Sequence, residues 1–317
     1  MKCEQFSFPS SDGKTAIVAY YFLPDEGVTP VGVVQLSHGM TDYVLRYREM
    51  AEALTSAGFI FCGNDHIGHG QSAGTEEDLG FFAEKDGIGY VLDDLHAMTA
   101  LAKQRFPDLP FTLMGHSMGS FLCRLYATRF GYELDNLVIL GTGGPNQLLG
   151  FGKLFAKMVK LFKGSHHRSQ TIKNLAFSGY TSHYEKGAHK NAWLTRDEAV
   201  LKTYDADPLC TFTFTVSAYL DLFTMLQECN KKTWFESYPK ALRTLIAAGT
   251  EDPVGDWGQG PVYVTDYLKK EEVHEVDLLL YEGARHELFN ELNKEEFFHD
   301  LIAWLSPKEA APTAEKA

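Results

Sequence analysis

The first 142 residues alternate between short apolar runs and segments in which apolar residues recur at every third or fourth position. The second pattern is typical of amphipathic helices and occurs at 46–57 and 88–105. Short apolar runs bounded by glycine or polar residues are typical of buried strands. We expect such strands at 31–39, 59–64, 111–115 and 136–141. This order predicts a parallel sheet with helices on both of its faces.

The alternation stops after residue 142 and resumes near residue 239. The segment between them is rich in aromatic residues and in helical spacing, with no clear strand pattern. Strand-like runs return at 242–249 and 276–283, and a helical pattern follows at 295–305. An insertion between two halves of one sheet explains this order. We therefore predict a first core part at 1–142, an inserted cap or lid at 143–238, a second core part at 239–306 and a disordered tail at 307–317.

Ser117 lies in the sequence GHSMG, between a predicted strand and a predicted helix. Glycine at 115 and 119 costs backbone entropy on folding, so this spacing indicates a turn too tight for side chains. Such a turn lifts a serine hydroxyl clear of the sheet, where it can act as a nucleophile. The alternative is a glycine-rich turn with an inert serine. The residues that follow Ser117 in the chain favour the nucleophile.

A serine hydroxyl needs a base that takes its proton and an acid that orients the base. In a sheet of this order the acid and then the histidine follow the serine, each just beyond a strand end. Among the twelve histidines His286 fits best, because it follows the run at 276–283. Glu251 and Asp252 both follow the run at 242–249. We favour Asp252 as the acid and keep Glu251 as the alternative.

Ester cleavage also needs N–H donors for the negative charge that develops on the carbonyl oxygen. One donor is expected from the backbone of Met118, directly after the serine. The other is expected from a loop after an early strand, where the sequence LSHGM makes Met40 the candidate. Because backbone groups donate, the side chains of both residues can be apolar.

Five motifs occur in order across nearly the whole chain: LSHGMTDYVLRY, DHIGHGQSAG, GHSMG, GTEDPVG and YEGARH. Together they resemble the monoacylglycerol lipase and lysophospholipase branch of the α/β-hydrolases, a family of serine hydrolases. The resemblance implies an α/β-hydrolase fold, in which a mostly parallel eight-stranded sheet is flanked by helices and a helical cap is inserted after the sixth strand. It carries over Ser117, Asp252 and His286 as the catalytic triad, and Met40 and Met118 as the oxyanion donors.

The resemblance also implies residues that contact the head group of the substrate. Monoacylglycerol lipases hold glycerol with an acid and an arginine soon after the HG motif, and Asp42 and Arg46 stand at those positions. A salt bridge between a loop and a helix is the alternative role for this pair. The family places a histidine three residues after the catalytic one, but this chain has Phe289 there. Strict recognition of glycerol is therefore not implied.

The predicted cap supplies apolar side chains for an acyl pocket, since such sites are mainly apolar with a few fixed polar groups. The candidates for this pocket and lid are Phe151, Phe155, Leu222, Phe223 and Leu226 of the cap, together with Phe289. Residues 151–164 form a basic amphipathic helix, with four lysines opposite an apolar face. This helix either covers the active-site cleft with its lysines in solvent, or makes transient contact with a membrane or micelle surface as a mobile lid.

Charge and cysteine content narrow the class of protein. The 317 residues carry a net charge of −13, which argues against a nucleic-acid partner. Five scattered cysteines without a CxxC pair indicate neither a disulfide framework nor a zinc site, and they favour reduced thiols in the cytosol. We find no signal peptide and no apolar run long enough to span a membrane.

The sequence HIGH at 66–69 matches a nucleotide-binding signature of aminoacyl-tRNA synthetases. The acidic balance and the lack of an evident surface for tRNA oppose that function. A metal site formed by Asp65, His66 and His69 is the other alternative, but the family that the chain resembles is metal-free. We therefore expect neither a metal ion nor another cofactor.

These observations predict a cytosolic serine hydrolase that cleaves esters of single-chain lipids through an acyl-enzyme on Ser117. Monoacylglycerol, cleaved to glycerol and a fatty acid, is the favoured substrate. A lysophospholipase or a carboxylesterase of broad specificity is the alternative. A non-catalytic binding protein with the hydrolase fold is disfavoured, because every catalytic position is filled.

Overall fold

The computed structural model describes residues 1–306, so the predicted disorder of 307–317 lies outside the described residues. The structure has eight strands, most of them rich in β-branched, aromatic or other apolar residues, which suit the pleated surface of a sheet. The strands are β1 (Lys2–Pro9), β2 (Ala16–Leu23), β3 (Gly32–Ser37), β4 (Phe59–Asn64), β5 (Phe111–His116), β6 (Asn136–Leu140), β7 (Arg243–Gly249) and β8 (Val276–Tyr281). They form one sheet in the order β1-β2-β4-β3-β5-β6-β7-β8.

The sheet is mixed but mostly parallel. The strand β2 pairs antiparallel with both β1 and β4, whereas every pair from β4 through β3 to β8 is parallel. Parallel strands need crossover connections, and helices supply them here. This arrangement confirms the predicted fold class.

Each face of the sheet is covered by its own helices. Neighbouring residues of one strand point to opposite faces, and Val33 and Val34 accordingly belong to two different apolar clusters. The cluster that contains Val33 includes residues of α2 (Gly87–Arg105), α3 (Met118–Phe130) and α10 (Gln259–Lys270). The cluster that contains Val34 includes residues of α1 (Arg48–Ser56) and α11 (Lys294–Leu305). The core is therefore two apolar layers with the sheet between them.

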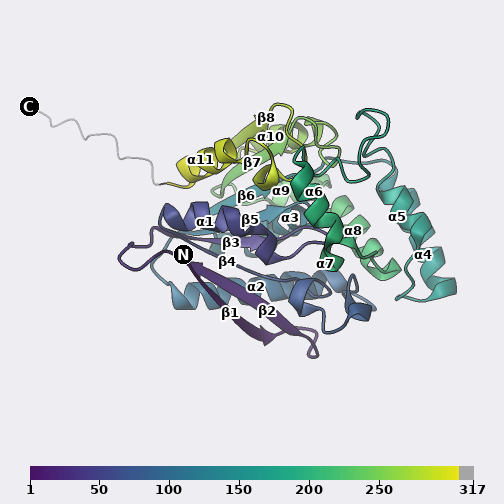
Figure 1. The fold of residues 1–317 in the computed structure, drawn as a ribbon, viewed down its shortest axis with the longest axis horizontal. Helices are drawn as coiled ribbons and strands as arrows, with labels where there is room; N and C mark the ends of the chain where they lie inside the picture. The colour runs from purple at the N-terminus through teal and green to yellow at the C-terminus, as the bar shows by residue number, and fades with distance from the viewer. Residues whose placement is uncertain (307–317) are drawn as a thin grey trace, which may run out of the picture.

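Six helices lie between β6 and β7. They are α4 (Leu149–Lys163), α5 (Gln170–Ala176), α6 (Glu198–Ala206), α7 (Pro208–Thr211), α8 (Val216–Glu228) and α9 (Lys232–Ser237). The helix α8 packs against α4 on one side and against α2 and α3 of the core on the other. Figure 1 shows α4 and α5 at the right-hand edge of the molecule, with α8 between them and the sheet. These helices support the predicted insertion, whose bounds at 143 and 238 stay a prediction.

Membrane-spanning helices need about 20 apolar residues in succession. None of the helices within residues 1–306 is long and apolar enough to cross a membrane.

Candidate active site

Ser117 occupies a sharp turn between the end of β5 and the start of α3. Its φ of 55° and ψ of −121° are strained for a residue with a side chain. A Cβ on Gly119 would lie 1.9 Å from the carbonyl oxygen of Ser37, and one on Gly115 would lie 2.3 Å from the carbonyl oxygen of Gly119. No other residue fits at either position without moving the backbone. The two glycines thus permit the close approach that holds Ser117 at the end of the sheet.

His286 and Asp252 form a buried hydrogen-bonded pair. Asp252 follows β7 and His286 follows β8, so adjacent parallel strands bring both to one edge of the sheet. The Nδ1 of His286 donates to Oδ2 of Asp252 at 2.9 Å, and both side chains are buried. The other carboxylate oxygen of Asp252 accepts the backbone N–H of Val254 at 2.8 Å. Glu251, the alternative acid, is exposed. The structure therefore places Asp252 against the histidine.

The second nitrogen of His286 is buried and has no hydrogen-bond partner within the described residues. A buried polar atom is normally paired, so this nitrogen has no protein partner that would compete for a proton from Ser117. The ring is held in place by Trp193 and His116, with ring centroids at 5.1 and 4.7 Å. A Cβ on Gly141 would lie 3.0 Å from Cε1 of His286, so this glycine leaves room for the imidazole.

The predicted oxyanion donors lie on the two segments next to Ser117. Met118 is the first residue of α3, and N–H groups in the first turn of a helix have no acceptor within it. The helix dipole adds partial positive charge at the same place. The loop with Met40 also passes close by, because a Cβ on Gly39 would lie 3.3 Å from Cβ of Ser117. The donor role of Met40 and Met118 stays a prediction that this placement supports.

Asp42 and Arg46 form a buried ion pair at 2.9 Å, which is the alternative role considered for them. Arg46 also binds Glu287 with two hydrogen bonds, of 3.0 and 2.8 Å. Burial, the largest single influence, raises the pKa of Asp42, but the charge of Arg46, together with His116 and the hydrogen bonds from Tyr47 and Arg46, holds that pKa below its usual value. A head-group contact for Asp42 and Arg46 stays a prediction. Sequence reasoning missed Glu287, although its place directly after His286 was a signal.

The candidate acyl-pocket residues do not all lie together. Phe223 is buried, and the half-buried Phe155, Leu222 and Leu226 pack on the same apolar cluster. Phe151 is 65% exposed. Phe289 belongs to the cluster on the opposite face of the sheet, where its ring stacks on Tyr47 with centroids 4.2 Å apart and meets His116 edge-on at 5.0 Å. A role in the acyl pocket stays a prediction for all six residues.

The HIGH sequence forms part of a buried histidine cluster. The backbone N–H of His66 donates to Nε2 of His38 at 2.9 Å, and Nε2 of His66 lies 3.0 Å from the hydroxyl of Ser37. Burial lowers the pKa of both rings well below the usual value, so they are neutral. Gly68 permits a tight turn here, since a Cβ would lie 2.4 Å from the carbonyl oxygen of Phe81. Residues 1–306 contain no group of three or more His, Cys, Asp or Glu side chains that could hold a metal ion.

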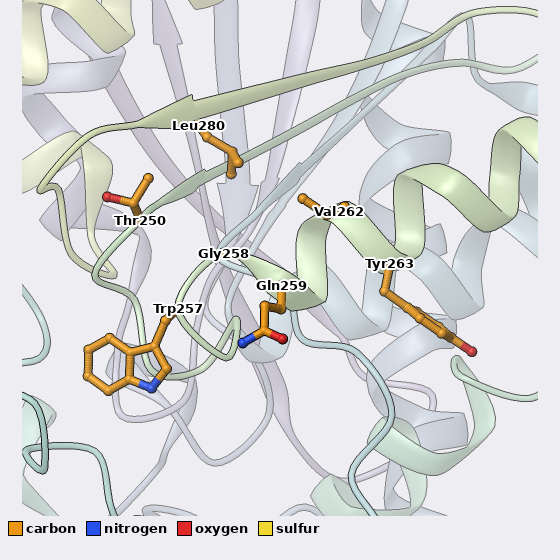
Figure 2. Close-up of a pocket in the computed structure, with 7 residues that line it drawn as sticks. All are labelled: Thr250, Trp257, Gly258, Gln259, Val262, Tyr263 and Leu280. Atoms are coloured by element: carbon orange, nitrogen blue, oxygen red, sulfur yellow. The ribbon is translucent and has the colours of Figure 1, made fainter.

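An open pocket of about 450 Å³ lies beside the loop that carries Asp252, rather than around Ser117. Figure 2 shows Trp257 and Gln259 at its rim, between the end of β7 and the start of α10. The ring of Trp257 stacks on His183 at 3.9 Å. This pocket does not contain any residue of the predicted triad.

Known proteins resemble this chain over most of its length. Residues 28–293 match the family described as Hydrolase_4, serine aminopeptidase S33. The chain is 26% identical to a monoacylglycerol lipase of Mycolicibacterium smegmatis, over 92% of this chain and 94% of that protein. It is also 26% identical to human monoglyceride lipase, over 89% and 84% of the two chains. The structure resembles a thermostable carboxyl esterase of Bacillus coagulans, solved in complex with glycerol, with a TM-score of 0.89, 27% identity and coverage of 96% and 98%.

The matched region spans the strands β3 to β8, the helices inserted between β6 and β7, and every residue of the predicted triad. This chain therefore belongs to the Hydrolase_4 family of α/β-hydrolases and is a serine hydrolase of the branch that contains monoacylglycerol lipases and esterases.

Proposed function

We propose that this protein hydrolyses carboxylic esters of single-chain lipids, with monoacylglycerol as its preferred substrate. The observation that carries the proposal is the buried pair of Asp252 and His286, whose free Nε2 lies at the same sheet edge as the strained Ser117. The relatives named monoacylglycerol and monoglyceride lipase support the choice of substrate.

The reaction begins when Nε2 of His286 takes the proton of the Ser117 hydroxyl as its oxygen attacks the ester carbonyl. The negative oxygen of the tetrahedral intermediate accepts the backbone N–H groups of Met40 and Met118. His286 then gives the proton to the departing glycerol, which leaves the fatty acyl group on Ser117. A water molecule, deprotonated by His286, releases the fatty acid. Asp252 holds the tautomer of His286 that keeps Nε2 free to accept a proton.

Lysophospholipids, or carboxylic esters of wider range, are the alternative substrates. One observation favours them: Glu287 already binds Arg46, the residue predicted to hold the glycerol head group. The resemblance to a carboxyl esterase structure points in the same direction. A purely binding role is disfavoured because Ser117, Asp252 and His286 are all present.

We expect a higher kcat/KM for 1-oleoylglycerol than for 1-oleoyl-lysophosphatidylcholine. Both substrates carry the same acyl chain, so a difference measures recognition of the head group alone. The measurement is the initial rate of release of oleic acid from mixed micelles of one detergent. Equal rates or the reverse order would mean that the acyl pocket sets specificity, and the preference for monoacylglycerol would be wrong.

The proposal extends to the surface on which the substrate is found. The helix α4 and its N-cap expose apolar side chains, namely Leu148, Phe151, Leu154, Met158, Leu161 and Phe162, with exposed fractions from 47% to 80%. Large exposed apolar patches mark interaction sites on soluble proteins. The four lysines of the same helix favour anionic surfaces. We propose that α4 makes transient contact with a membrane or micelle that holds the lipid ester.

Exchange of both Leu161 and Phe162 for serine is expected to weaken binding to anionic phosphatidylglycerol vesicles by about 100-fold or more, because full burial of each such side chain contributes about 1.5–3 kcal/mol. Co-sedimentation measures the binding. Hydrolysis of water-soluble p-nitrophenyl butyrate should not change. Tyr132→Ser is the control, since Tyr132 is also 80% exposed but lies outside α4. Vesicle binding equal to that of the unchanged protein would contradict the contact.

A cytosolic location is part of the same proposal. The five cysteines are free thiols, four of them buried, which suits a reducing compartment.

A further inference from the structure

Glu287, the residue after His286, forms an ion pair with Arg46 on another segment of the site. The carboxylate of Glu287 is 3% exposed and accepts both terminal nitrogens of Arg46, with Nη1 at 3.0 Å and Nη2 at 2.8 Å. It also accepts Nδ2 of Asn290 at 2.7 Å. Two parallel hydrogen bonds between a guanidinium and a carboxylate define orientation as well as distance. The pair spans 241 positions of sequence, so it joins the loop after β8 to the loop after β3.

Arg46 is a single cation between two buried carboxylates. Its Nη1 also donates to Oδ1 of Asp42 at 2.9 Å. Burial lowers the pKa of Arg46, but the charges of Glu287 and Asp42 raise it well above its usual value, so the guanidinium stays charged. Its side chain is 10% exposed and lies over the ring of Tyr204 at 4.9 Å. The arginine is thus engaged by protein groups on both sides.

Hydrogen bonds connect Asp42 to the turn that contains Ser117. The hydroxyl of Tyr47 donates to Oδ2 of Asp42 at 2.6 Å and lies 2.9 Å from Nδ1 of His116, the residue before Ser117. The Nε2 of His116 lies 3.2 Å from the carbonyl oxygen of His286. Oδ2 of Asp42 also lies 3.5 Å from the position that a Cβ on Gly39 would take. Gly39 belongs to the loop that carries the predicted oxyanion donor Met40, which we call the oxyanion loop. Arg46 therefore connects three segments of the site.

We propose that Arg46 and Glu287 are positioning residues, whose ion pair holds the loop of His286 in register with the oxyanion loop. This inference rests on the proposed ester hydrolysis and assigns Arg46 a role other than binding the head group. A displacement of about 1 Å in a reacting group can lower the rate by about 100-fold. Loss of the pair therefore lowers kcat, and it does so whatever alcohol the ester contains.

The test compares 1-oleoylglycerol with methyl oleate, which has the same acyl chain and no hydroxyl groups on its alcohol. Glu287→Gln keeps the shape of the side chain but removes its charge, and Arg46→Lys keeps the charge but loses the paired geometry. We expect each variant to lower kcat by about 10- to 100-fold on both esters alike. The KM for each ester should stay within about twofold, because positioning acts on the reacting step.

Two further measurements separate positioning from general loss of structure. The control is Arg243→Lys, which loosens the ion pair of Arg243 with Glu275 at the far end of β7. It should lower the Tm and leave kcat unchanged. A fluorophosphonate labels Ser117 by displacement of fluoride, so the labelling rate reports on activation of the serine without an alcohol leaving group. This rate should fall in Glu287→Gln and Arg46→Lys. Glu287→Gln carries the test by itself if Arg46→Lys does not accumulate as folded protein.

A loss confined to 1-oleoylglycerol, with methyl oleate and labelling unaffected, would overturn the inference and return Arg46 to the head group. Unchanged kcat on both esters would overturn it as well. In either case the wild-type protein still cleaves both esters. If the unchanged protein cleaves neither ester and Ser117 is not labelled, the proposed function itself fails.

Discussion

Replacement of Ser117 with alanine is expected to lower kcat for ester hydrolysis by about a million-fold, because no other group in the proposed mechanism can carry the acyl chain. The turn should persist, since Gly115 and Gly119 create the space for it and both are unchanged. Release of oleic acid from 1-oleoylglycerol measures the rate. The thermal unfolding midpoint checks that the fold is intact.

The matched control for this change is Ser120→Ala, one turn further along α3. The hydroxyl of Ser120 donates to the carbonyl oxygen of Ser117 at 2.6 Å, so it supports the turn but has no place in the proposed chemistry. Its loss should reduce kcat by less than about tenfold, the scale of one neutral hydrogen bond. Activity retained in Ser117→Ala would show that Ser117 is not the nucleophile.

Replacement of Asp252 with asparagine is expected to lower kcat by about 10,000-fold, the second largest effect. The amide can donate to Nδ1 of His286, which favours the tautomer in which Nε2 carries the proton and cannot accept another. The partner variant is Glu251→Gln, which removes the charge of the exposed neighbour. We expect that variant to stay within about threefold of the unchanged protein, as most exposed substitutions have small effects.

Both variants are assayed by release of oleic acid from 1-oleoylglycerol. The ratio of their kcat values then identifies the acid. A large loss in Glu251→Gln with little loss in Asp252→Asn would reverse the assignment. Equal small losses would mean that His286 needs no buried acid and that the hydrogen bond at 2.9 Å has another purpose.

Most of the fold could be predicted from local patterns. Apolar runs identified the strands β3 to β8 to within a few residues, and the helix expected at 295–305 is α11 (Lys294–Leu305). The helix predicted at 46–57 ends just before Gly58, whose φ of 90° lies in the left-handed region that favours glycine. That helix is in fact two pieces, a 3-10 turn at Val44–Tyr47 and then α1. Arg46 and Tyr47 of that 3-10 turn contact Glu287 and His116, and no local pattern encodes these contacts.

Within the site, sequence reasoning could propose only the residues whose order along the chain the fold fixes. A serine in a glycine turn, and an acid and a histidine at later strand ends, can be identified from sequence because the fold family imposes that order. The pairing of Arg46 with Glu287 joins distant segments, and neither charge indicates its partner. The burial of Phe289 against Tyr47 and His116 likewise depends on how three distant segments of the chain meet. Residue types were therefore easier to predict than their contacts.

The central claim is that Ser117 forms an acyl-enzyme, and intact-protein mass spectrometry with a fluorophosphonate tests it most directly. The account predicts one adduct per chain, located on the peptide with Ser117 and formed more slowly when 1-oleoylglycerol is present. Ser117→Ala should give no adduct. An adduct on another residue, or hydrolysis of 1-oleoylglycerol that continues after Ser117 is fully labelled, would contradict the account.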